Sequence, residues 1–278
     1  MVDLARHHDP GEDPARGDRQ PGRVLTGLDR SSARAFASVA ESYERRRPDY
    51  PADAIDWLAA KLGLGPGTTV VDLGAGTGKL TRQLVPTGAR VIAVEPLPEM
   101  LAQLEAAVPG AEAHLGTAEV MPLPDGSADA VTAASAFHWF EHERALPEIH
   151  RVLRPGGAVG IVGNGRALND PLQAAVQEIV GPYLPGPEDL RAWVSHLDLS
   201  PLFGPLETYW TSFEQHFDGE GLAERIGTIS YIARLPDEER REVLARVRAV
   251  GDAQPVSPFA FRYRTVVTVC RAVAATTL

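Results

Sequence analysis

The sequence has few of the residues that mark disulfide-rich, membrane-spanning or polyanion-binding proteins. Its single cysteine, Cys270, excludes an intrachain disulfide and a cysteine-based metal cluster, and it indicates a reducing, cytoplasmic location. No apolar run approaches the roughly 20 residues of a membrane span. Acidic residues outnumber basic ones, 37 to 27, and the net charge of -10 argues against non-specific attraction to nucleic acid or to an anionic membrane. The expected partner is a small molecule or an exposed peptide.

The 278 residues are enough for one large domain with a buried core, and 44% of them are hydrophobic. The first 30 residues are rich in proline, glycine, aspartate and arginine, which predicts a disordered tail. We expect residues 31–165 to form amino-terminal cap helices and a Rossmann-like core. Residues 166–278 are expected to form a helical lid and the last two strands of the sheet.

Short apolar segments alternate with helical ones through the first half of the chain. This order predicts an α/β fold with a doubly wound sheet of five parallel strands. The later half places helical segments before and between two further strands, which predicts an antiparallel two-strand finish with a helical lid insertion. Strands are expected at 68–73, 90–95, 111–116, 128–136, 158–164, 206–217 and 259–273. Helices are expected at about 79–85, 98–108, 143–153, 170–181, 187–197, 221–227 and 236–250.

The stretch VVDLGAGTGKL, residues 70–80, is the most informative one. Gly74, Gly76 and Gly78 let the backbone turn tightly and approach a ligand before the next helix begins. A dinucleotide fingerprint would place its third glycine at position 79, where this sequence has lysine. The nearby acid, Asp72, would repel a pyrophosphate and attract a cation. The turn therefore favours a cationic ligand without phosphate.

The order DxGxGxG in this stretch resembles motif I of the class I S-adenosylmethionine-dependent methyltransferases, whose cofactor carries an ammonium and a sulfonium. The segments LGTAEVMPLPDGSADAV and RVLRPGG are similar to segments of that family, and ISYIARLPDEER and FASVAESYERRRPDYP resemble segments of its small-molecule branch. SAFHWF falls near the place where the trans-aconitate methyltransferase relatives carry an aromatic motif. The resemblance runs from about Phe36 to the carboxyl end. It implies a Rossmann-like fold, S-adenosyl-L-methionine as cofactor, S-adenosyl-L-homocysteine as product, and a small-molecule acceptor.

The same resemblance implies which residues bind each ligand. The expected cofactor-binding residues are Asp72, Gly74, Gly76, Gly78, Glu95, Pro96, Thr117, Ala118, Glu119, Ser135, Tyr43 and Arg47. The expected substrate-binding residues are Phe137, Trp139 and Tyr231. Each group has a simpler interpretation. Asp72 can merely cap the turn, residues 117–119 can form an ordinary loop, and Tyr43 and Arg47 can lie together on a solvated helix face.

The stretch SAFHWFEHERAL carries two histidines four residues apart. On one helix, His138 and His142 would share a face, as zinc ligands do. The following helix is expected to begin only near Glu143, so His138 falls on the preceding loop and metal binding is disfavoured. That loop lies at the carboxyl edge of the sheet, next to the glycine turn. His138 is therefore the candidate catalytic residue, as a base for the acceptor or as a wall that orients it.

We interpret the chain as an S-adenosylmethionine-dependent methyltransferase (EC 2.1.1 class) that acts on a small molecule, mainly at a carboxylate or hydroxyl oxygen. The carboxyl end of a peptide is a further candidate acceptor. A cyclase or rearrangement enzyme on the same fold, using the sulfonium charge without methyl transfer, stays open as an alternative. A nicotinamide-dependent dehydrogenase is disfavoured by the glycine turn, and a non-catalytic binding module also stays open.

Overall fold

The computed structural model describes residues 47–184 and 194–273. The expected tail, residues 1–30, and the site candidate Tyr43 lie outside the described residues. So does most of the expected helix at 187–197, of which the structure describes only a short helix, α7 (Ser195–Asp198). Among the described helices, none combines the length and the apolar character needed to cross a membrane.

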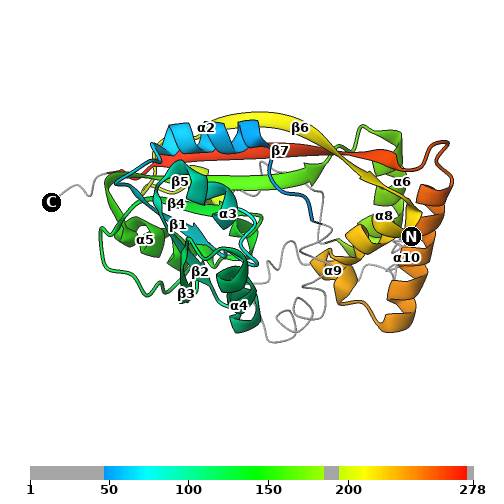
Figure 1. The fold of residues 1–278 in the computed structure, drawn as a ribbon, viewed down its shortest axis with the longest axis horizontal. Helices are drawn as coiled ribbons and strands as arrows, with labels where there is room; N and C mark the ends of the chain where they lie inside the picture. Colours follow the sequence, from blue (N-terminus) through cyan, green and yellow to red (C-terminus); the bar gives the residue numbers. More distant parts are fainter. Residues whose placement is uncertain (1–46, 185–193, 274–278) are drawn as a thin grey trace, which may run out of the picture.

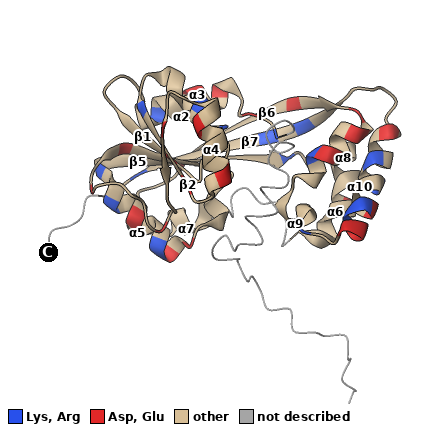
Figure 2. Cartoon of the chain, turned by 60° about the horizontal axis from the view of Figure 1, so that its bottom comes forward, with Lys and Arg blue, Asp and Glu red and all other residues tan. Residues whose placement is uncertain are grey.

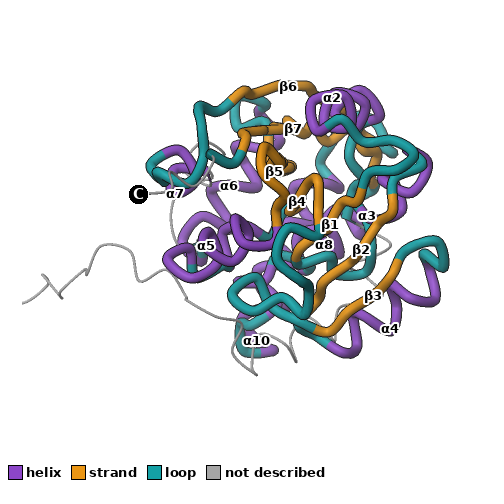
Figure 3. Tube along the Cα trace, turned by 90° about the vertical axis from the view of Figure 1, so that its left-hand side faces the viewer, coloured by secondary structure: helices purple, strands orange, loops and turns teal. Residues whose placement is uncertain are grey.

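The described residues form one seven-stranded sheet in the order β3-β2-β1-β4-β5-β7-β6 (Figures 1 and 3). The first five strands run parallel, and β7 pairs antiparallel with both β5 and β6. This confirms the doubly wound α/β fold with an antiparallel finish. The strands are β1 (Thr69–Leu73), β2 (Arg90–Glu95), β3 (Glu112–Leu115), β4 (Ala128–Ala134), β5 (Leu153–Arg166), β6 (Glu207–Phe217) and β7 (Phe259–Arg271).

Helices cover both faces of the sheet, which explains why its central strands are apolar without alternation. Every residue of β1 is buried, and neighbouring residues point to opposite faces: Val70 packs with α2 (Ala52–Leu62) and α3 (Thr81–Leu84), and Val71 packs in the cluster of α5 (His142–Val152) and α7. Figure 3 shows these two pairs of helices on opposite sides of the sheet.

Two local predictions need correction. The helix expected at about 79–85 is only the four-residue α3, continued by a 3-10 turn at Val85–Thr87, because the glycine turn extends as far as residue 80. Strand β5 begins at Leu153, earlier than the expected residue 158. Its pairing with β4 jumps from Ala128–Leu153 to Ala130–Ala158, so the RPGG segment is looped out of the ladder.

Beyond the carboxyl ends of the parallel strands, four helices form what we call the helical unit: α6 (Pro171–Val180), α8 (Gly219–Gly227), α9 (Ser230–Ala233) and α10 (Asp237–Asp252) (Figure 1). They share a hydrophobic cluster with the outer ends of β6 and β7. Helices α8 and α10 approach so closely at two glycines that a Cβ on Gly251 would lie only 2.6 Å from the Cα of Gly219. The long antiparallel pair β6 and β7, between which α8, α9 and α10 are inserted, therefore carries one end of the sheet into the helical unit.

The remaining helix, α4 (Pro98–Ala107), follows β2 and packs against the glycine turn. A Cβ on Gly78 would lie 3.0 Å from Val108 and 3.1 Å from Leu104. The third glycine of the turn thus serves close helix packing, with a φ of 90° that L side chains rarely adopt.

Candidate active site

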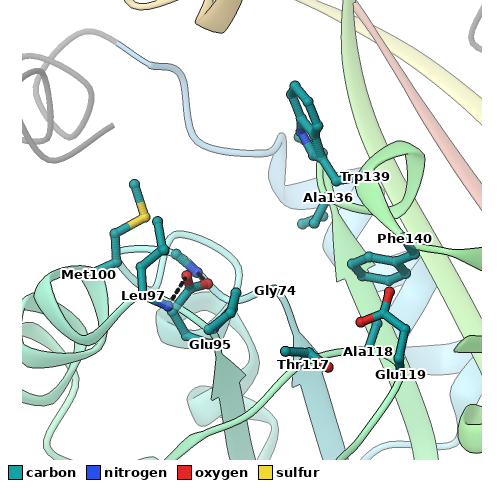
Figure 4. Close-up of a pocket in the computed structure, with 14 residues that line it drawn as sticks. Gly74, Glu95, Leu97, Met100, Thr117, Ala118, Glu119, Ala136, Trp139 and Phe140 are labelled. Atoms are coloured by element: carbon teal, nitrogen blue, oxygen red, sulfur yellow. Dashed lines mark hydrogen bonds between the residues drawn. The ribbon is translucent and has the colours of Figure 1, made fainter. Parts of the chain in front are cut away.

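A pocket of about 270 Å³ opens at the carboxyl ends of the parallel strands (Figure 4). It gathers most of the residues that the sequence predicted for the site: Gly74, Gly76, Glu95, Pro96, Thr117, Ala118, Glu119, Ser135 and Trp139. The rest of the lining is apolar and was not predicted: Leu97, Met100, Ala134, Ala136 and Phe140. The carboxyl ends of neighbouring parallel strands meet at one edge, which brings these separate segments together.

The first two glycines of the turn let the backbone form one wall of this pocket. Gly74 has a φ of 66° and Gly76 a φ of 58°, in the left-handed region that favours glycine. A Cβ on Gly74 would lie 2.8 Å from the Cβ of Ala136, so the turn touches the segment after β4. A side chain at position 74 would therefore displace one wall of the pocket.

Glu95 ends β2 and is held by backbone donors. Its Oε2 accepts a hydrogen bond from Gly76 N at 2.8 Å and its Oε1 accepts one from Leu97 N at 3.0 Å. Figure 4 shows the carboxylate beside the glycine turn. The side chain is 3% exposed, and burial raises its pKa to about 7. Each carboxylate oxygen keeps a further lone pair for a ligand hydroxyl.

Asp72 lies beneath the glycine turn and does not line the pocket. Its carboxylate accepts hydrogen bonds from the hydroxyls of Thr81, at 2.6 Å, and Thr132, at 3.2 Å. The residue is 1% exposed, and burial raises its pKa to about 6. Asp72 thus connects β1, α3 and β4, which is the turn-anchoring role that the sequence offered as its simpler interpretation.

Ser135 is the one described residue other than glycine with a positive φ, 53°. Its backbone N–H donates to Val162 O at 2.8 Å, and its hydroxyl lies 3.1 Å from the hydroxyl of Tyr50. Tyr50 is fixed in turn by Gln83, which bonds its N–H and its carbonyl. Tyr50 was missed in the sequence, although it follows the arginine run just before α2. A strained residue in a pocket wall is a common mark of a functional site.

The two histidines of SAFHWFEHERAL are separated by the structure. His138 lies in a 3-10 turn, Phe137–Trp139, and α5 begins at His142. Burial lowers the pKa of His138 to about 4, and the positive charge of Arg47 acts in the same direction. His142 Nε2 lies 3.1 Å from Phe137 O, and its ring stacks on His196 at 4.1 Å. The second histidine therefore joins α5 to α7.

The aromatic residues of the same segment divide between the core and the site. Phe137 is 2% exposed and packs against Phe140 and His142, so it lies behind the pocket and does not line it. Trp139 lines the pocket and stacks on Tyr231 of α9, with ring centroids 6.0 Å apart. The structure therefore joins two of the three predicted substrate-binding residues.

Two arginines reach the same region. Arg47 donates hydrogen bonds to the carbonyl and the hydroxyl of Thr228, at 3.0 and 3.2 Å, where α8 ends. Arg234 follows α9, and its guanidinium carbon lies 5.7 Å from the ring centroid of Trp139 and 5.6 Å from that of Tyr231. Arg234 was not predicted, since nothing in its local sequence distinguishes it from the other arginines of the helical unit.

Comparison with known proteins agrees with this geometry. Residues 71–161 match a family model described as a methyltransferase domain. The chain is 39% identical over 231 residues to an uncharacterized methyltransferase of Mycobacterium tuberculosis, covering 83% of this chain and 91% of the relative. The chain belongs to the methyltransferases. It therefore belongs to the EC 2.1.1 class of enzymes, as the sequence predicted.

More distant relatives support the same assignment. The methyltransferase is 33% identical over 211 residues to a trans-aconitate 2-methyltransferase of Azoarcus sp., covering 70% of this chain and 82% of that one. A solved structure from Anaeromyxobacter dehalogenans, provisionally assigned as a type II methyltransferase, superposes with a TM-score of 0.62 at 24% identity, over 81% of this chain and 97% of that one. The structural likeness supports the class I methyltransferase fold.

Proposed function

We propose that the methyltransferase uses S-adenosylmethionine as methyl donor and transfers the methyl group to an oxygen atom of a small-molecule acceptor. The observation that carries this proposal is the pocket in which the glycine turn, Glu95 and Trp139 meet. When bound, S-adenosylmethionine supplies a methyl group on a sulfonium, already activated for in-line displacement. The residues of the chain then have to bind the two reactants, align them and exclude water.

The chemistry of the lining fits this cofactor. The charged residues that line the described pocket are Glu95 and Glu119, both acidic. Such a lining attracts a cationic ligand and repels a pyrophosphate. Glu95 can accept the two ribose hydroxyls through its remaining lone pairs, and residues 117–119 can flank the adenine. Pro96 and Ser135 complete this set, while Asp72 supports it through the turn.

The acceptor is proposed to lie on the side of Trp139 and Tyr231, away from Glu95. An oxygen acceptor that is already anionic needs no general base, whereas a neutral hydroxyl has to lose a proton. A histidine with a pKa of about 4 is neutral near pH 7 and only weakly basic. His138 therefore suits the orienting role better than the role of base. The relative named as a trans-aconitate 2-methyltransferase agrees with a small organic acceptor.

Calorimetry with S-adenosylhomocysteine tests the cofactor site. We expect Glu95→Ala to weaken binding at least about tenfold, since hydrogen bonds to a charged group are typically worth 1.5–3 kcal/mol. The matched control is Glu99→Ala, an exposed glutamate on α4. Absence of binding to the wild-type protein would overturn the proposal. Turnover of S-adenosylmethionine without a product heavier by one methyl group would instead favour the cyclase or rearrangement alternative.

A further inference from the structure

Arg234 contacts Trp139, which lines the pocket, and Tyr231, which belongs to the helical unit. It is the residue directly after α9, and its guanidinium lies over the rings of both Trp139 and Tyr231. Trp139 is itself part of the pocket wall (Figure 4). The two rings stabilise the positive charge through their π faces. The rings do not accept hydrogen bonds from the N–H groups of the guanidinium, because these N–H bonds lie in the plane of the group and point away from the rings.

Within the part of the chain that the structure describes, Nε and Nη2 of Arg234 are shielded from solvent and have no hydrogen-bond acceptor. Leaving a buried charged donor unpaired is costly, so such groups normally meet an acceptor. Nε and Nη2 form one edge of the guanidinium, with two parallel donors. This edge matches the two oxygens of a carboxylate in a bidentate pair.

Several arginines at the surface behave differently. Arg90, Arg151 and Arg262 each pair with a carboxylate of the chain, and Figure 2 shows acidic and basic segments side by side along α10. In the described part of the helical unit, the buried Arg225 has no carboxylate partner and donates to the hydroxyl of Tyr263 at 3.0 Å. The side of the unit that faces Trp139 therefore keeps positive charge that no described carboxylate neutralises.

We propose that Arg234 binds a carboxylate of the methyl acceptor and positions the acceptor against Trp139 and Tyr231. This inference rests on the proposed function. Bidentate pairing occupies lone pairs of both carboxylate oxygens and lowers their nucleophilicity, so the methylated oxygen belongs to a second group. The acceptor is thus an acid with a further carboxylate or hydroxyl, and Arg234 is the residue that selects it over neutral molecules.

The experiment uses two planar acids as probes, fumarate and salicylate, each against its amide, fumaramide and salicylamide. Calorimetry is done on the full chain, with and without S-adenosylhomocysteine. We expect at least one acid to bind the loaded wild-type protein at least about tenfold more tightly than its amide. Arg234→Gln should abolish this preference and Arg234→Lys should restore it in part. The exposed Arg246 gives the matched control, Arg246→Gln, which should keep the preference.

The outcomes separate the two proposals. If neither acid is preferred over its amide, or if Arg234→Gln keeps the preference, the inference about Arg234 is wrong while cofactor binding still stands. If the wild-type protein does not bind S-adenosylhomocysteine at all, the proposed function is wrong. Affinity for S-adenosylhomocysteine in Arg234→Gln should stay within about threefold of wild type, which shows that the variant folds.

Discussion

The two sides of the site bury charges of opposite sign. On the pocket side, Asp72 and Glu95 are 1% and 3% exposed, and the pKa of each carboxyl is raised by burial. On the side of the helical unit, Arg225 is 6% exposed and two nitrogens of Arg234 are shielded. The pocket is acidic where a sulfonium cofactor is proposed, and the opposite side is basic where an acid is proposed. Trp139 marks the boundary between them.

The largest effect is expected where backbone forms the pocket wall. In Gly74→Ala, the new Cβ would lie 2.8 Å from Ala136 Cβ at a φ of 66°. Strain and displacement of about 1–3 kcal/mol should weaken S-adenosylhomocysteine binding about 5- to 150-fold, measured by calorimetry. Gly126→Ala is the control, because Gly126 also has a positive φ, 58°, but open space around it. Equal losses in both variants would contradict a pocket-specific role.

The buried acid under the turn should show in the pH dependence of stability. The folded-state pKa of Asp72, about 6, lies above the ordinary value of 3.8. The stability that neutral Asp72 contributes is therefore complete below about pH 3.8 and is lost as the pH rises through 6. Over that interval the free energy of unfolding of wild type should fall by about 3 kcal/mol relative to Asp72→Asn.

Urea unfolding of both proteins at several pH values between 4 and 7 measures this difference. Asp56→Asn, at an exposed position on α2, is the control and should run parallel to wild type. A constant difference between wild type and Asp72→Asn would mean that Asp72 titrates normally.

We expect a substitution in the helical unit to lower the stability of that unit without changing the pocket. In Gly251→Ala, the Cβ would lie 2.6 Å from the backbone of Gly219, forcing α8 and α10 apart. We expect a loss of about 1–3 kcal/mol, seen as faster hydrogen exchange in α8 and α10, with cofactor affinity unchanged. Gly65→Ala, where nothing lies within 4 Å, is the control. Faster exchange in β1 and β2 as well would show that the two regions unfold together.

The smallest effect is expected at His138, which precedes Trp139 in the 3-10 turn after β4. In His138→Gln, methyl transfer should stay within about threefold of wild type, because removal of a true general base typically costs 10²–10⁴-fold. His216→Gln, at an exposed position on β6, gives the control. Activity is followed by mass detection of the methylated product. A loss of a hundredfold or more would restore His138 as the base.

Sequence reasoning worked well where function depends on neighbouring elements. Gly76 and Glu95 lie 19 residues apart, and a strand, a turn, a helix and a strand suffice to bring them within hydrogen-bond distance. It worked less well for residues that lie behind the pocket wall and do not line the pocket. Asp72 and Gly78 share the motif with Gly74, but the structure places one beneath the turn and the other against α4. A motif shows that residues are needed together and does not show which of them touch the ligand.

The sequence by itself determined the half of the site that is proposed to bind the cofactor, because local strand, turn and helix signals set which backbone groups meet at the sheet edge. Only the tertiary structure decided the half that is proposed to bind the acceptor. Tyr50 reaches Ser135, and Arg234 reaches Trp139, from segments far along the chain. The first contact depends on how the segment before α2 folds over the end of β4, and the second on how β6 and β7 carry the helical unit against the sheet edge. No periodicity or spacing in the sequence records that geometry. The edge of Arg234 that finds no acceptor among the described residues becomes visible only once its surroundings are known.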